Sequence, residues 1–288
     1  MYFFSSNMRF LLIGLLVIMN INISSQEIIS SFDGHQGDFY MNWGYNRAFF
    51  NESDIHFQGK GYDFTIYDVE AKDLPETFNT KVYFNVKKIS IPQFNFRIGY
   101  YLTDRLSLSI GSDHMKYVMS QNQIVKIEGT IDKSLSETYG GEYHGERITL
   151  SDDFLRYEHT NGFNFVRVGL EYRTDIWQSA NTFHNIVAMP GINIGPVLPW
   201  TNYTFLNERH SDLFHLGGFG FSASSAFRYE FKNTGFFQIQ AQYGFSHLSR
   251  VLLEDRSGDY TAKQNIVFFE RSFALGVYLH SFNKHKKK

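Results

Sequence analysis

The chain has 288 residues and a formal net charge of -2, with 27 Lys and Arg against 29 Asp and Glu. This near-neutral balance, spread without a basic stripe, argues against nucleic acid as a partner. The absence of Cys excludes a disulfide framework, a thiolate metal site, a Cys nucleophile and a lipid anchor on Cys. The length suffices for one large all-β domain or two ordinary ones.

An export signal is predicted over residues 1–25. Arg9 precedes an unbroken apolar run, residues 10–19, and a short polar stretch then leads to the small residue Ser25. The alternative is a membrane anchor, but the run has only about half of the roughly 20 apolar residues that a spanning helix needs. No apolar run of that length follows. The mature chain therefore either stays soluble outside the cytoplasm or enters a membrane by another route.

Apolar and aromatic residues alternate with small or polar residues along the mature chain. Between residues 93 and 102, for example, Phe94, Phe96 and Ile98 lie on one side of an extended chain and Asn95 and Arg97 on the other. Alternation of period two predicts β-strands. Eight such segments occur, at residues 37–50, 91–103, 106–119, 154–173, 186–197, 213–231, 236–250 and 266–282.

The polar face of these segments is mostly Gly, Ser, Asn and Gln, whereas a soluble β-sandwich would turn Lys, Glu and Thr outward. This composition is typical of the crowded interior of a small barrel whose apolar face meets lipid. The 30 Phe and 18 Tyr, many near segment ends, match the aromatic girdles of such barrels. Because a narrow barrel is crowded, one Gly per segment is predicted to face the lumen, namely Gly44, Gly99, Gly111, Gly169, Gly195, Gly220, Gly244 and Gly276.

Short joins alternate with long joins between the segments, which predicts short periplasmic turns and long extracellular loops. We therefore predict one all-β domain, residues 26–282, folded as a closed antiparallel transmembrane β-barrel. Eight strands are expected. Residues 54–57 and 62–69 either form a hairpin above the membrane or add a pair to make ten strands. A basic periplasmic tail, residues 283–288, follows.

Side chains fill the lumen of an eight-stranded barrel, so a diffusion pore is not expected. Isolated buried charges are unfavourable, so the lumen-facing charges are predicted to pair as a structural plug. These charges are Arg97, Asp113, Arg167, Glu171, Arg228, Glu230 and Glu270. The alternatives are a proton or ion path and a narrow channel.

The chain resembles the eight-stranded outer-membrane barrels of Gram-negative bacteria, the class that includes the OmpA transmembrane domain, OmpX and the lipid A deacylase PagL. The last segment ends on Phe282, and an aromatic end is the barrel-assembly signal of that class, although residues 283–288 follow it here. The resemblance covers architecture across the mature chain and includes no diagnostic motif. It implies a location in the outer membrane.

Function is expected in two long outer loops, residues 51–90 and 120–153, because exposed loops on a rigid scaffold usually carry binding. The predicted roles are adhesion, ligand or partner binding, or envelope integrity. The second loop contains strand-like residues 123–130 and a stretch rich in Gly and Tyr, residues 139–145.

The expected partners in the membrane are lipid and lipopolysaccharide. Arg250 and Arg271, near the outer boundary, are candidate contacts for lipid phosphates. No cofactor and no metal site are predicted. Two His five residues apart in an extended chain do not converge, so His210 and His215, with Asp212 between them, are not expected to hold a metal ion.

The main prediction is a protein that is not an enzyme, and the alternative is a lipid A or phospholipid acyl hydrolase. His247 and Ser249 are placed by the period-two register on the lipid side, and an imidazole beside a hydroxyl is the minimum for acyl transfer. This pair is similar to the His-x-Ser of PagL-type deacylases. The resemblance implies His247 as base, Ser249 as nucleophile and Glu254 as an orienting acid. Arg250 stands where that family has Asn.

Overall fold

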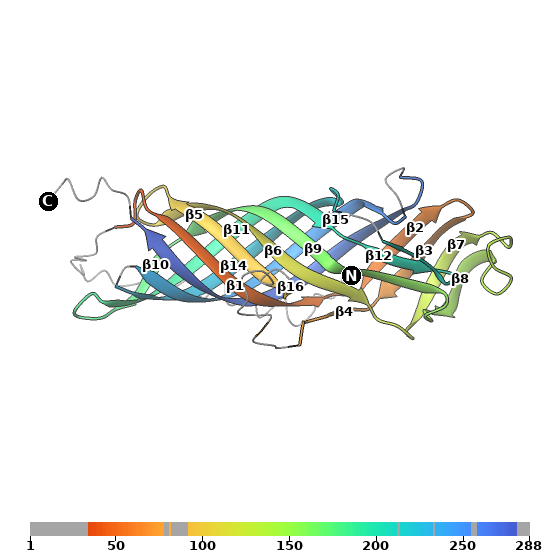
Figure 1. Cartoon of the computed structure of the whole chain (residues 1–288), viewed down its shortest axis with the longest axis horizontal. Helices are drawn as coiled ribbons and strands as arrows, with labels where there is room; N and C mark the ends of the chain where they lie inside the picture. The colour runs from red at the N-terminus through yellow and green to blue at the C-terminus, as the bar shows by residue number, and fades with distance from the viewer. Residues whose placement is uncertain are drawn as a thin grey trace, which may run out of the picture. The chain divides into compact units, whose positions relative to one another are not determined.

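The computed structural model describes residues 34–77, 81, 92–211, 214–232, 234–254 and 258–280. The predicted export signal and the basic tail lie outside these residues and stay predictions. Within the described part, sixteen strands form one antiparallel sheet (Figure 1). No helix in this part is long and apolar enough to cross a membrane.

Eight of the described strands form a closed ring, because β1 pairs with β5 on one side and with β16 on the other. Antiparallel pairs connect the ring in the order β1, β5, β6, β9, β11, β14, β15, β16 and back to β1. The strands of the ring are β1 (Phe39–Phe50), β5 (Phe94–Tyr101), β6 (Leu106–Met119), β9 (Leu155–Tyr172), β11 (His184–Pro199), β14 (Gly218–Phe231), β15 (Gly235–Leu252) and β16 (Thr261–Leu279). The predicted closed antiparallel barrel is confirmed, with eight strands rather than ten.

The predicted segments match these strands closely, with the largest differences where strands extend above the ring. β16 begins at Thr261 rather than at residue 266, and its first residues pair with β15 and β2. β14 begins at Gly218 rather than at residue 213. β10 (Thr174–Gln178), which the alternation did not indicate, pairs with β11 at the opposite, periplasmic end.

Further strands build an extracellular lobe above the ring, together with the outer ends of β6, β9, β15 and β16. β2 (Ser53–Gly59) and β3 (Tyr62–Val69) form the hairpin predicted above the membrane. β2 pairs with the outer end of β16, and β3 pairs with β7 (Ile124–Ile131), which confirms the strand predicted near residues 123–130. The lobe also contains β4 (Ala71–Asp73), β8 (Gly141–Thr149), β12 (Asn202–Phe205) and β13 (Glu208–Ser211).

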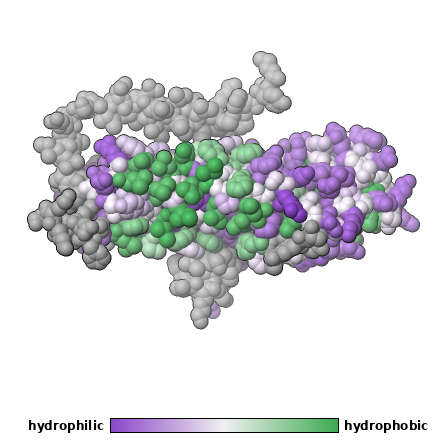
Figure 2. Space-filling model, turned by 90° about the horizontal axis from the view of Figure 1, so that it is seen from above, coloured by the Kyte–Doolittle hydropathy of each residue, from purple (hydrophilic) through white to green (hydrophobic). Residues whose placement is uncertain are grey.

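The outward face of the wall changes from apolar to polar between the ring and the lobe. Apolar side chains cover the ring end of the molecule and polar ones cover the lobe end (Figure 2). The exposed apolar side chains of the ring include Ile98, Ile110, Val168, Ile192, Ile194, Phe221, Ile239 and Leu275. In the lobe, β3 instead buries Phe64 and Ile66 and exposes Asp63. Because lipid requires an apolar wall and water a polar one, this change marks the outer boundary of the membrane.

The lumen of the ring holds a network of buried charges, as predicted. Asp113 lies between two arginines, since Arg97 pairs with one carboxylate oxygen and Arg167 Nε lies 3.0 Å from the other. Glu270 accepts a hydrogen bond of 2.6 Å from Asn95, which also donates to Asp113. All five side chains are buried. The network therefore joins charges from opposite parts of the wall.

A second group of charges lies nearer the periplasmic end. Arg173, which the sequence prediction did not include, binds both carboxylate oxygens of Glu230 at 2.5 and 2.8 Å. The Arg228 guanidinium lies 4.5 Å from the centre of the Tyr40 ring and 3.9 Å from Glu171. The Tyr40 hydroxyl donates to Glu171 at 2.5 Å. These contacts confirm the predicted salt-bridged plug.

Lumen-facing glycines make room for aromatic rings on the neighbouring strand. The rings of Tyr40, Phe236 and Phe268 lie over their cross-strand partners, which are Gly99, Gly276 and Gly244 in that order. A Cβ at any of these three glycines would lie 2.1 to 2.2 Å from a ring carbon. Close approach therefore explains these glycines, in agreement with the prediction.

Aromatic and aliphatic side chains replace the charges in the outer half of the molecule. The buried core there includes Phe57, Phe64, Met115, Tyr117, Tyr157, Phe163, Tyr203, Phe205, Val251 and Phe268. Many of the rings contact each other, as Phe57 and Tyr203 do with centroids 5.8 Å apart. Ion pairs thus occupy the inner part of the ring, and an apolar core occupies its outer part and the lobe.

Replacing Asp113 with Asn tests the role of the network in stability. The change leaves the buried charges of Arg97 and Arg167 without their shared carboxylate, so we expect the free energy of unfolding to fall by about 3–5 kcal/mol. Urea unfolding in lipid vesicles, followed by tryptophan fluorescence, measures it. The control is Asp152→Asn, which removes an exposed ion pair with Arg156 and is expected to change stability by less than about 1 kcal/mol. Equal effects of the two changes would contradict the account.

Candidate functional site in the extracellular lobe

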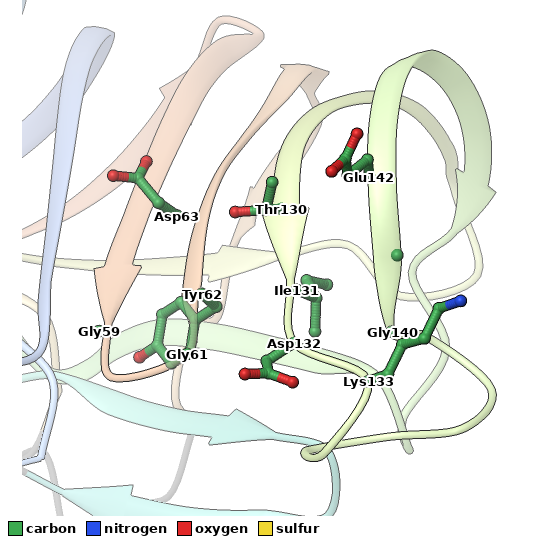
Figure 3. A pocket seen from close by; sticks show the side chains of 11 residues that line it. Gly59, Gly61, Tyr62, Asp63, Thr130, Ile131, Asp132, Lys133, Gly140 and Glu142 are labelled. Atoms are coloured by element: carbon green, nitrogen blue, oxygen red, sulfur yellow. The ribbon is translucent and has the colours of Figure 1, made fainter.

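The outer end of the lobe contains a pocket of about 860 Å³ (Figure 3). Its walls come from the turn between β2 and β3 and from the segment between β7 and β8. The lining residues are Gly59, Gly61, Tyr62, Asp63, Thr130, Ile131, Asp132, Lys133, Gly140, Gly141 and Glu142. Both loops in which function was predicted, residues 51–90 and 120–153, contribute to it.

Strand register places three polar side chains in one row beside the pocket. Asp63 on β3 is the partner of Thr130 on β7, and Thr130 is the partner of Glu142 on β8. Figure 3 shows this row across the three strands. Successive side chains of a strand point to opposite faces, so Tyr62 and Ile131, which precede and follow these residues, are buried in the core of the lobe.

The two loops are tied together at the pocket by backbone contacts. The Asp132 amide donates a hydrogen bond of 2.7 Å to the carbonyl oxygen of Gly61. Gly61 has a φ of 83°, and the Leu135 side chain packs so closely over it that an added Cβ would lie 3.0 Å from that side chain. A residue with a Cβ would be strained at this turn. The pocket is therefore formed by the fold itself, before any ligand is bound.

Carboxylates dominate the electrostatics of the pocket. It holds Asp63, Asp132 and Glu142 against one cation, Lys133. The Ser134 backbone amide donates to the Asp132 carboxylate at 2.9 Å, and this hydrogen bond lowers the pKa of Asp132 below its ordinary value. A lowered pKa keeps that carboxylate ionised at neutral pH. The pocket therefore favours groups that are positively charged or donate hydrogen bonds.

Within the described ranges, no group of three or more His, Asp or Glu side chains is arranged to hold a metal ion. His215 Nε2 accepts a hydrogen bond of 3.1 Å from the Leu252 amide, and His210 lies 3.7 Å from Glu254. Asp212 lies outside the described residues. The two histidines that flank it therefore contact different partners.

The structure places His247 and Ser249 on the outward face of β15, but at the level of Asn265, where that face is polar rather than lipid-facing. His247 Nδ1 lies 2.7 Å from Asn265 Oδ1, the side chain opposite it on β16. Glu254, predicted to orient His247, instead lies beside His210. Hence the structure gives the imidazole an orienting amide that the sequence prediction missed, in place of the predicted acid.

Sequence reasoning selected the two loops but missed the residues that line the pocket. Asp63 is distant in the chain from Asp132 and Glu142, and only the pairing of β3, β7 and β8 brings the three together. The one available signal in the sequence was glycine where the strands meet their turns, at positions 59 and 61 between β2 and β3 and at positions 140 and 141 before β8. Glycines that flank alternating runs mark tight turns.

No family model matches the sequence, and no curated protein matches it either. Among solved structures, the outer membrane protein OprG from Pseudomonas aeruginosa matches 86% of this chain and 98% of its own, with 10% identity and a TM-score of 0.41. The outer membrane protease OmpT from Escherichia coli matches 87% of this chain and 99% of its own, with 8% identity and a TM-score of 0.42. Ail of Yersinia pestis matches with 10% identity over 85% of this chain and 99% of its own, with a TM-score of 0.31.

Proposed function

We propose that this protein is an outer-membrane barrel without a diffusion pore that binds a polar, positively charged ligand in the pocket of its extracellular lobe. The observation that carries the proposal is the pocket itself. Two loops from separate parts of the chain fold into one sheet and line it, with the Asp132 amide bonded to Gly61. Rigid elements that hold a concave surface are the usual setting of a binding site.

The filled lumen supports action at the surface rather than transport. Ion pairs around Asp113 and Glu230 occupy the inner part of the ring, and aromatic side chains occupy the outer part. Moving a solute through the ring would require breaking these buried pairs, which is strongly unfavourable. The lobe, in contrast, presents its polar face to water without any rearrangement.

The charges of the pocket indicate the class of ligand. Three carboxylates and one lysine leave an excess of negative charge, and each ionised carboxylate oxygen accepts hydrogen bonds. A ligand with several amino groups, such as a polyamine, a basic peptide or an amino sugar, matches these acceptors. Ion pairs between an ammonium and a carboxylate would then orient it.

Spermine is a suitable probe of this proposal. We expect the refolded wild-type barrel to bind spermine in isothermal titration calorimetry, and the double change Asp132→Asn with Glu142→Gln to weaken binding at least tenfold. The matched control is Glu137→Gln, since Glu137 is an exposed carboxylate of the same segment that does not line the pocket. No binding by the wild type, or equal weakening by the control, would contradict the proposal.

A lipid acyl hydrolase is the second candidate, and the contact between His247 and Asn265 favours it. An amide that accepts a hydrogen bond from Nδ1 would leave Nε2 as the base. No hydrogen bond joins His247 to Ser249 in the described part of the chain. We therefore expect no release of fatty acid from lipid A or phospholipid vesicles by the purified protein. Release that Ser249→Ala abolishes would establish the hydrolase instead.

A further inference from the structure

Two arginines lie opposite each other on the outward face of the ring. Arg47 on β1 is the register partner of Arg271 on β16. Both side chains point away from the lumen. Their neighbours along the strands, Asn46, Ala48 and Glu270, are buried inside, and successive side chains of a strand point to opposite faces. The wall thus presents two arginine side chains from directly opposite positions of neighbouring strands.

These arginines are surrounded by apolar side chains. The other outward residues on β1 are Phe39, Met41, Trp43, Tyr45 and Phe49, and those on the facing part of β16 are Val267, Phe269, Phe273, Leu275, Val277 and Leu279. The Arg271 guanidinium lies 5.3 Å from the centre of the Phe49 ring. Arg47 and Arg271 are therefore the only charged residues on this part of the lipid-facing wall.

The pair lies close to the outer boundary of the membrane. The pairing of β1 with β5 ends at Tyr45, two positions before Arg47, and β1 itself ends at Phe50. The next strand, β2, already belongs to the lobe, whose outward face is polar. On β16, two outward apolar positions, Phe269 and Val267, separate Arg271 from the first polar outward residue, Asn265, so the two arginines lie near the outer edge of the apolar wall.

The contacts that the described protein makes with the two charges are weak, and the Arg47 guanidinium donates a hydrogen bond of 2.7 Å to the Asn46 carbonyl oxygen. Neither guanidinium forms an ion pair with a carboxylate in the described ranges. Burial raises the pKa of Asp73 on β4, and the nearby charge of Arg47 acts in the opposite direction. The Asp73 oxygens accept hydrogen bonds from the Ala48 amide and the Gln93 side chain and form no ion pair with Arg47. Like charges directly opposite each other destabilise a sheet, and charges on a lipid-facing wall are unfavourable. An anion between the two arginines would remove both penalties.

We propose that Arg47 and Arg271 together bind the phosphate group of a lipid in the outer leaflet. Guanidinium groups bind phosphate oxygens in pairs of parallel hydrogen bonds, and two of them side by side match one phosphate. Phe49 and Phe269, next along the same two strands, contact the adjoining part of the lipid. This site is separate from the pocket of the lobe and does not depend on the ligand proposed there.

Native mass spectrometry of the detergent-solubilised full chain tests the site with defined lipids. We expect the wild type to retain one molecule of phosphorylated lipid A, and the double change Arg47→Gln with Arg271→Gln to weaken this binding at least tenfold. Lipid A without its phosphates should not bind. The control is Lys263→Gln, an exposed outward residue of β16 within the lobe, and it should bind as the wild type does.

Phosphatidylglycerol distinguishes the two sources of phosphate. If the wild type binds both phosphorylated lipid A and phosphatidylglycerol, and the Arg47→Gln, Arg271→Gln variant binds neither, the site is supported and phospholipid is a second occupant. Equal binding of phosphorylated and dephosphorylated lipid A, or unchanged binding in the double variant, would overturn the proposal. The double variant removes repulsion, so it should fold, and a shift in gel mobility on boiling verifies this. The charge-conserving Arg47→Lys with Arg271→Lys should retain part of the affinity if phosphate is the ligand.

Discussion

The narrow lumen of an eight-stranded ring is the constraint on which the other features depend. Inward side chains have no solvent to face, so they must fill the lumen and satisfy each other. Asp113 between Arg97 and Arg167 satisfies the buried charges, and Gly99 beneath Tyr40 makes room for a large ring. Because the interior is occupied in this way, the surfaces available for function are the lipid-facing wall and the lobe.

The apolar and polar faces of the long strands exchange sides where the barrel continues into the lobe. Along β16, one face is apolar in the ring because it meets lipid, and the same face carries Asn265 and Lys263 above it, where it meets water. The opposite face changes from Glu270 in the ring to the apolar Ile266 and Ala262 in the lobe. An apolar core then holds β2, β3 and β7 in place, and this core supports the pocket.

Much of this fold could be predicted from local pattern, because the alternation of apolar and polar residues can be recognised within each strand without knowledge of its neighbours. Residues 106–119 match β6, and all seven predicted lumen charges are buried. The site could not be predicted in the same way. The neighbours of Asp63, the opposition of Arg47 to Arg271 and the contact between His247 and Asn265 all depend on register between separate strands. Short strands such as β12 and β13 are too brief to show a period.

Conductance of the purified barrel in planar lipid bilayers tests most directly whether the lumen is sealed. The account predicts no discrete current steps across a range of salt concentrations and voltages, because buried ion pairs and aromatic side chains fill the ring. Insertion is verified by the change in gel mobility on boiling of protein recovered from the same lipid. Discrete steps from verified, folded protein would contradict the account and would favour a narrow channel.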